Sequence, residues 1–135
     1  MSEDLLKDYA GFVDSVTSQD SKELESLIER LRELETIENI NVARLMTGAI
    51  GLSGETGEFS DLAKKVFFHR KELDSDIEMK LKKELGDIAW DWVNACTALG
   101  VDPQEAIQKN IEKLESRYPG GFSAWRSENR SKDDV

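Results

Sequence analysis

Two short acidic motifs contain the residues best suited to chemistry. Glu55 and Glu58 lie three positions apart in the first motif, and Glu84 and Asp87 repeat this spacing in the second. Side chains three positions apart share one face of an α-helix, so each motif would present a pair of carboxylates. Grouped carboxylates repel one another and are costly to bury without partners, and divalent cations would remove that cost. Oxygen ligands suit Mg²⁺ or Mn²⁺, so the motifs favour a site for such ions.

The alternative is that each acidic pair belongs to a solvated helix face. Both pairs, however, flank the apolar stripes of helices that we expect to be neighbours, which favours one shared site over two unrelated surfaces. A zinc site is disfavoured, because the single histidine, His69, stands alone and the single cysteine, Cys96, falls within an apolar stripe.

A complementary set of polar side chains occurs nearer the end of the chain. Asn110, Lys113 and Arg117 project from one edge of the apolar stripe of the last predicted helix. An amide and two cations on one face could hold a phosphate chain that bridges to metal ions on the carboxylates. A solvated basic face is the alternative, and the acidic motifs weigh against it.

About five helices must position these groups. Apolar residues recur at helical intervals and show no alternating strand pattern, which predicts an all-α helical bundle. The expected helices cover roughly residues 3–18, 20–34, 41–67, 75–99 and 103–118. The link around residues 69–75 is short, so the third and fourth helices should be antiparallel core neighbours. That arrangement would bring both acidic motifs to the edge of one core.

Local signals mark the ends of several helices. Capping-box spacing places the starts of the second and fourth helices at Asp20 and Ser75. Asp102 is expected to cap the last helix, and Gly100 to end the helix before it.

Four glycines interrupt the third predicted helix at intervals of three, from Gly48 to Gly57. Each costs roughly 1 kcal/mol of helix stability relative to alanine, so something should compensate. Close approach of another helix or of a ligand to the backbone would do so, whereas a kinked or broken helix is the simpler alternative.

Length and charge limit the classes of protein to which the chain can belong. The 135 residues suit one domain, expected over residues 1–122, followed by a polar and flexible tail over residues 123–135. The net charge of −10 disfavours a nucleic acid polymer as partner. No apolar stretch approaches the roughly 18–20 residues of a membrane span, and the acidic N-terminus differs from a signal peptide. We therefore expect a soluble, cytoplasmic protein with no membrane partner.

Three blocks of sequence together resemble the MazG-type nucleotide pyrophosphohydrolases. These blocks are Gly54–Glu58, Glu84–Ile88 and Asn110–Pro119, and the resemblance covers roughly residues 42–122. The first two blocks match the family pattern E-x-x-E, a spacer, then E-x-x-D. The family belongs to the all-α NTP pyrophosphatase superfamily, which also contains dimeric dUTPases and dCTP pyrophosphatases.

The resemblance implies metal-dependent hydrolysis of a nucleoside triphosphate, expected to be a deoxynucleotide, to the monophosphate and pyrophosphate. Water would attack the α-phosphorus, with Mg²⁺ as cofactor and Mn²⁺ able to substitute. The resemblance implies that the metal ligands are Glu55, Glu58, Glu84 and Asp87. Glu55 or Glu58 would also activate the water. Contacts to the phosphates or the sugar would come from Asn110, Lys113 and Arg117. Asp91 follows the second motif by one turn, and its role as a further ligand, a sugar contact or a bystander stays open.

A second apolar face on the fourth predicted helix indicates assembly. Trp90, Val93 and Thr97 project opposite the core stripe, which favours a homodimer or homotetramer.

Two other functions stay open. One is a pyrophosphohydrolase of the same fold that acts on a phosphoribosyl-nucleotide; the other is a non-catalytic helical scaffold, suggested by the leucine-rich second segment.

Overall fold

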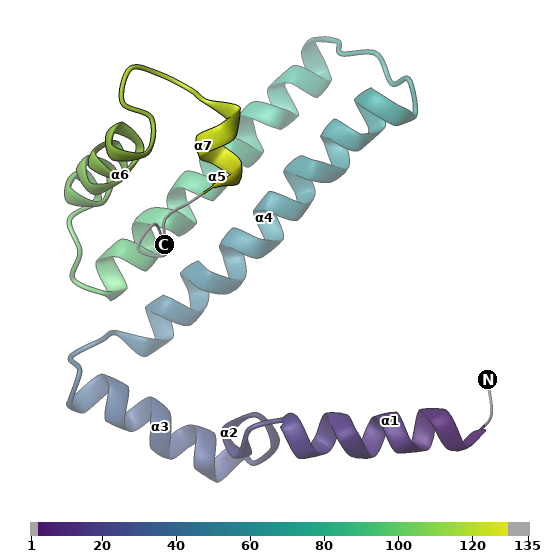
Figure 1. Cartoon of the computed structure of the whole chain (residues 1–135), viewed down its shortest axis with the longest axis vertical. Coiled ribbons are helices and arrows are strands. Elements are labelled where there is room, and N and C mark those ends of the chain that lie inside the picture. The colour runs from purple at the N-terminus through teal and green to yellow at the C-terminus, as the bar shows by residue number, and fades with distance from the viewer. Residues whose placement is uncertain (1–2, 130–135) are drawn as a thin grey trace. The chain divides into compact units, whose positions relative to one another are not determined.

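The computed structural model describes residues 3–129 of the chain, and every regular element within them is an α-helix (Figure 1). The all-α prediction is therefore confirmed. The helices are α1 (Glu3–Val16), α2 (Gln19–Lys22), α3 (Leu24–Thr36), α4 (Val42–Phe68), α5 (Ser75–Ala98), α6 (Pro103–Arg117) and α7 (Ala124–Glu128).

The chain divides into two compact units, Met1–Val42 and Ala43–Val135. The first contains α1, α2 and α3, and the second contains nearly all of α4 together with α5, α6 and α7. A single domain over residues 1–122 stays a prediction. All the candidate site residues belong to the second unit.

The first unit differs from the predicted helices at one point. The expected helix over residues 20–34 is split into α2 and α3, because Glu23 adopts an extended backbone conformation (φ −121°, ψ 123°). The predicted capping box at Asp20 is therefore wrong: Asp20 lies inside α2, and its carboxylate accepts a hydrogen bond from the Ser26 hydroxyl. The Asp20 carboxylate thus binds a nearby side chain and does not cap a helix.

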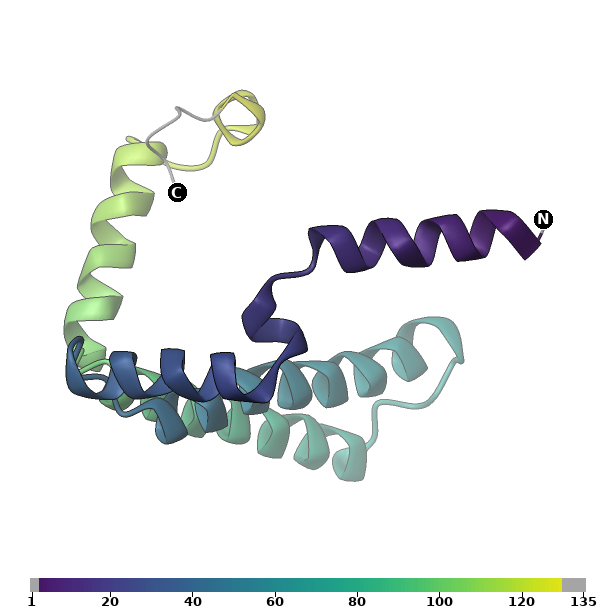
Figure 2. The ribbon, with the colours of Figure 1, turned by 90° about the horizontal axis from the view of Figure 1, so that it is seen from below.

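The second unit is organised around α4 and α5, which lie side by side and antiparallel, as predicted from their short link (Figures 1 and 2). The helix α4 runs unbroken for 27 residues, so the alternative of a broken helix at the glycines is wrong. A Cβ atom at Gly48 would lie 2.9 Å from the backbone nitrogen of Ala95, and one at Gly51 would overlap the Asp91 side chain. Close approach of α5 therefore explains two of the glycines, whereas Gly54 and Gly57 face open space.

The ends of α5 and α6 follow local sequence chemistry. Asp74, one residue before the predicted Ser75, caps α5 by accepting a hydrogen bond from the Ile77 backbone N–H at 2.9 Å. Gly100 has a φ of +66°, as its predicted role at the end of α5 requires. Asp102 accepts from the Gln104 N–H at 2.9 Å and caps α6, which confirms that prediction.

Few side chains of the second unit are fully enclosed. Among the described residues of this unit, the buried apolar side chains are those of Ile77, Cys96 and Ala98, all on α5, and many larger apolar side chains are exposed. Beyond α5, the helix α6 stands steeply away from the α4–α5 pair (Figure 2).

The predicted polar tail begins with a short helix. Ser123 caps α7 through its hydroxyl, which accepts a hydrogen bond from the Arg126 N–H. The rest of the expected tail, residues 130–135, lies outside the described residues. Within residues 3–129, none of the helices has the length and apolar character needed to cross a membrane.

Candidate functional site

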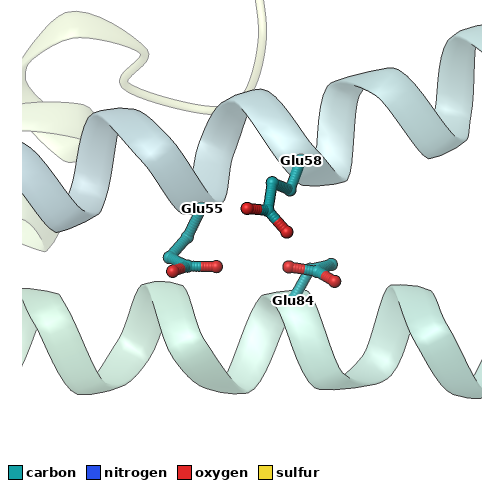
Figure 3. Close-up of side chains that lie close together, drawn as sticks. All are labelled: Glu55, Glu58 and Glu84. Carbon is teal, nitrogen blue, oxygen red and sulfur yellow. The ribbon is translucent and has the colours of Figure 1, made fainter.

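Three glutamates converge between α4 and α5. Glu55 and Glu58 project from α4 and Glu84 projects from α5, so that their carboxylates point toward one another across the gap between the helices (Figure 3). One oxygen from each side chain lies within 4.8 Å of the other two. Glu55 and Glu84 are half-buried, whereas Glu58 is exposed. The two acidic motifs therefore meet, as their placement on antiparallel neighbours predicted.

The electrostatics of this carboxylate cluster (Glu55, Glu58 and Glu84) are unfavourable without a cation. Partial burial raises the pKa of Glu55 above its ordinary value, and the charges of Glu58, Asp87 and Glu84 raise it further, as does a hydrogen bond with Glu84. A divalent cation would relieve the repulsion between like charges at this spacing, two of which are half-buried. The donors are all carboxylate oxygens, which suit Mg²⁺ or Mn²⁺.

Asp87 is the fourth predicted ligand. It is exposed on α5, one turn after Glu84, and its charge acts on Glu55. Its oxygens do not belong to the group that lies within 4.8 Å. A role for Asp87 as a metal ligand therefore stays a prediction.

A pocket of about 530 Å³ opens on one side of the cluster. It is lined by Gly54, Gly57, Glu58, Asp61, Leu62, Lys80 and Glu84. Asp61 and Lys80 were not predicted as site residues, although their spacing from Glu58 and Glu84 could have indicated them. Asp61 lies three residues after Glu58 and Lys80 four residues before Glu84, so each shares a helix face with a cluster residue.

Asp61 is held ionised by two lysines. Its carboxylate oxygens each lie 2.6 Å from an ammonium nitrogen, one from Lys64 and one from Lys65. These hydrogen bonds, led by that of Lys64, lower the pKa of Asp61 to about 2. Asp61 therefore carries its charge throughout the physiological pH range and is paired with two cations.

Asp91 lies on the other side of the cluster and is only 3% exposed. Its carboxylate rests against the backbone of Gly51 on α4. The three-oxygen cluster does not include Asp91. Its role therefore stays open, as in the sequence analysis.

The predicted phosphate-binding residues lie on α6. Asn110 is exposed, and Lys113 and Arg117 are half-buried. The guanidinium carbon of Arg117 lies 6.0 Å from the centre of the Tyr118 ring. None of the residues lining the pocket belongs to α6. Within this chain the structure does not bring these three residues to the pocket, and their assignment stays a prediction.

Comparison with known proteins agrees with the geometry. Residues 46–122 match the MazG nucleotide pyrophosphohydrolase domain, a range that contains every candidate site residue. The chain is also similar to the Gene 37 protein of Mycobacterium phage L5, with 32% identity over 85 residues, which cover 60% of this chain and 72% of that protein. No solved structure matches the chain significantly.

Proposed function

Because the chain belongs to the MazG nucleotide pyrophosphohydrolase family, we propose that it hydrolyses deoxynucleoside triphosphates to the monophosphate and pyrophosphate, using a divalent metal. Membership of this family implies a nucleotide pyrophosphohydrolase that acts on a nucleoside triphosphate and depends on a divalent metal. The observation that supports the proposal for this chain is the convergence of Glu55, Glu58 and Glu84, with one oxygen of each within 4.8 Å of the others.

The carboxylate cluster would hold the metal. Glu55, Glu58 and Glu84 would supply the donors, and Asp87, one turn after Glu84 on α5, would be the fourth ligand. When bound, Mg²⁺ or Mn²⁺ would neutralise phosphate oxygens and make water a better nucleophile at neutral pH. Without that neutralisation a triphosphate of about −4 would be repelled by the cluster.

The proposed reaction is one displacement at the α-phosphorus. The water oxygen forms a bond to phosphorus as the bond to the bridging oxygen breaks, and pyrophosphate leaves with the electron pair. Glu55 or Glu58 orients the water and accepts its proton. Asn110, Lys113 and Arg117 would contact the phosphates or the sugar.

We expect the enzyme to act as a homodimer or homotetramer. Trp90 is 61% exposed on α5, and Val93 and Thr97 are also exposed. An apolar face of this kind on a helix already packed against α4 fits a second copy of the chain.

The decisive experiment measures pyrophosphate release from a panel of dNTPs, NTPs and a phosphoribosyl-nucleotide, with Mg²⁺ or Mn²⁺. We expect release from dNTPs that requires the metal and falls by at least about 100-fold in Glu58→Gln. The matched control is Glu78→Gln, an exposed glutamate on α5 that does not line the pocket. A folded protein that releases nothing from any dNTP would contradict the proposal. Activity on the phosphoribosyl-nucleotide alone would support that alternative, and complete inactivity would support a scaffold.

A further inference from the structure

The pocket beside the carboxylate cluster extends in one direction only. Glu58 and Glu84 form its boundary with the cluster, and Asp61, Leu62 and Lys80 line it toward the α4–α5 link. In the other direction, the helices close upon each other where Asp91 fills the space over Gly51. A ligand chain that crosses the cluster therefore has room at the Lys80 end.

The two ends differ in the charged groups that they present. The Lys80 end gathers three ammonium groups, those of Lys64, Lys65 and Lys80, against the carboxylates of Asp61 and Asp76. The opposite end presents Asp91, a carboxylate that is only 3% exposed. The first end therefore offers donors for phosphate oxygens, whereas the Asp91 carboxylate at the second end offers none.

Lys80 is available to a ligand. Its ammonium nitrogen lies 2.7 Å from Asp76, and its side chain is 51% exposed. The hydrogen bond to Asp76 raises the pKa of Lys80, so the group is cationic at neutral pH. Exposed ion pairs of this kind contribute little to stability, so Lys80 can exchange Asp76 for a phosphate oxygen at small cost.

We propose that Lys80 binds the pyrophosphate leaving group, so that the β- and γ-phosphates lie at the Lys80 end of the pocket. This assignment rests on the proposed hydrolysis of a nucleoside triphosphate. As the bond from the α-phosphorus to the bridging oxygen breaks, the electron pair moves onto pyrophosphate, and the ammonium group stabilises the added negative charge. Lys80 would therefore contact the substrate directly.

The helix α5 provides a matched control for this residue. Lys82 also forms an i,i+4 ion pair, with Glu78 at 3.2 Å, and it is comparably exposed. It does not line the pocket. Lys80→Ala and Lys82→Ala thus remove the same group and the same kind of ion pair, and differ in access to the pocket.

The test measures product inhibition with the full-length protein and a dNTP that the wild type hydrolyses. We expect Lys80→Ala to raise the inhibition constant for inorganic pyrophosphate by about tenfold or more, because a charge-assisted contact is lost. The constant for the nucleoside monophosphate should not change, Lys82→Ala should match the wild type, and Lys80→Arg should retain most of the pyrophosphate affinity. Calorimetric titration of pyrophosphate in the presence of Mg²⁺ should show the same ranking without turnover.

Two results would overturn the assignment while leaving the hydrolysis intact. One is an unchanged pyrophosphate constant in Lys80→Ala. The other is an equal loss of affinity for the monophosphate, which would place Lys80 at the nucleoside end. A wild type that hydrolyses no nucleotide, measured in the same assay, would overturn the proposed function itself.

Discussion

The carboxylate of Asp91 on α5 lies directly against the Cα of Gly51 on α4, so that any side chain at position 51 would overlap it. This relationship links the glycine spacing of α4 to the buried carboxylate of α5. It also holds the two helices close together one turn from Glu55. The helix spacing at the carboxylate cluster therefore depends on a residue with no side chain.

Gly51→Ala should destabilise the protein, by about 1–3 kcal/mol, because the new methyl group displaces Asp91 or separates the helices. Gly54→Ala is the control, since nothing lies within 4 Å of a Cβ atom there. That substitution should stabilise α4 by up to about 1 kcal/mol. Denaturant unfolding of both variants measures the difference. Adding Asp91→Ala to Gly51→Ala should restore part of the loss; no recovery would show that the overlap with Asp91 is not its cause.

Ile77→Ala should be among the most damaging substitutions in α5. Ile77 is 1% exposed and is the largest fully buried side chain among the described residues. Truncation should lower the free energy of unfolding by about 2–5 kcal/mol, since the transfer and cavity terms add. Met79 lies two residues away and is 52% exposed, so Met79→Ala should cost far less. If chemical denaturation shows that both variants lose the same free energy of unfolding, Met79 is buried in the assembled protein.

Glu55→Gln should stabilise the metal-free protein at neutral pH. The pKa of Glu55 is raised in the folded state from 4.5, so the folded protein holds this proton more tightly than the unfolded chain does. The wild type therefore loses stability as the pH rises from about 4.5 through the raised pKa. Glutamine stays neutral and escapes this loss.

Melting temperatures in a chelator, measured between pH 4 and pH 8, test this expectation. The advantage of Glu55→Gln should vanish below the ordinary pKa of 4.5, where both states of the wild type are protonated. Mg²⁺ should raise the melting temperature of the wild type more than that of the variant. A variant less stable than the metal-free wild type at pH 7 would show that repulsion within the cluster is not significant.

Trp90→Glu should dissociate the expected oligomer. Trp90 is 61% exposed on the face of α5 that the sequence analysis assigned to subunit contact. Burying a new carboxylate at such an interface is costly, so the variant should sediment as a monomer where the wild type sediments as a dimer or tetramer. Trp125 on α7 is 69% exposed and lies outside the family match, which makes Trp125→Glu the control. A wild type of monomer mass at all concentrations would contradict the prediction.

Local chemistry explains which features were predictable. Asp102 and Gly100 act through neighbours within a few residues, so their roles at the helix ends could be read from the sequence. The expected cap at Asp20 failed because Ser26 competes for its carboxylate once the chain turns at Glu23. Lys80 was missed because its significance depends on the pocket that it lines, which is formed by two helices.

The sequence by itself determined the all-α class and the two carboxylate pairs, since a spacing of three places Glu55 beside Glu58 on any α-helix. Only the tertiary structure decided which carboxylates meet. The register between α4 and α5 is set where Gly48 and Gly51 fit against Ala95 and Asp91, and no local rule encodes a contact between residues so far apart. That register gathers Glu55, Glu58 and Glu84 and leaves Asp87 outside the group. The direction of α6 likewise depends on the tertiary structure. The spacing of its residues specifies which side chains share a face of the helix, but not where in the protein that face lies.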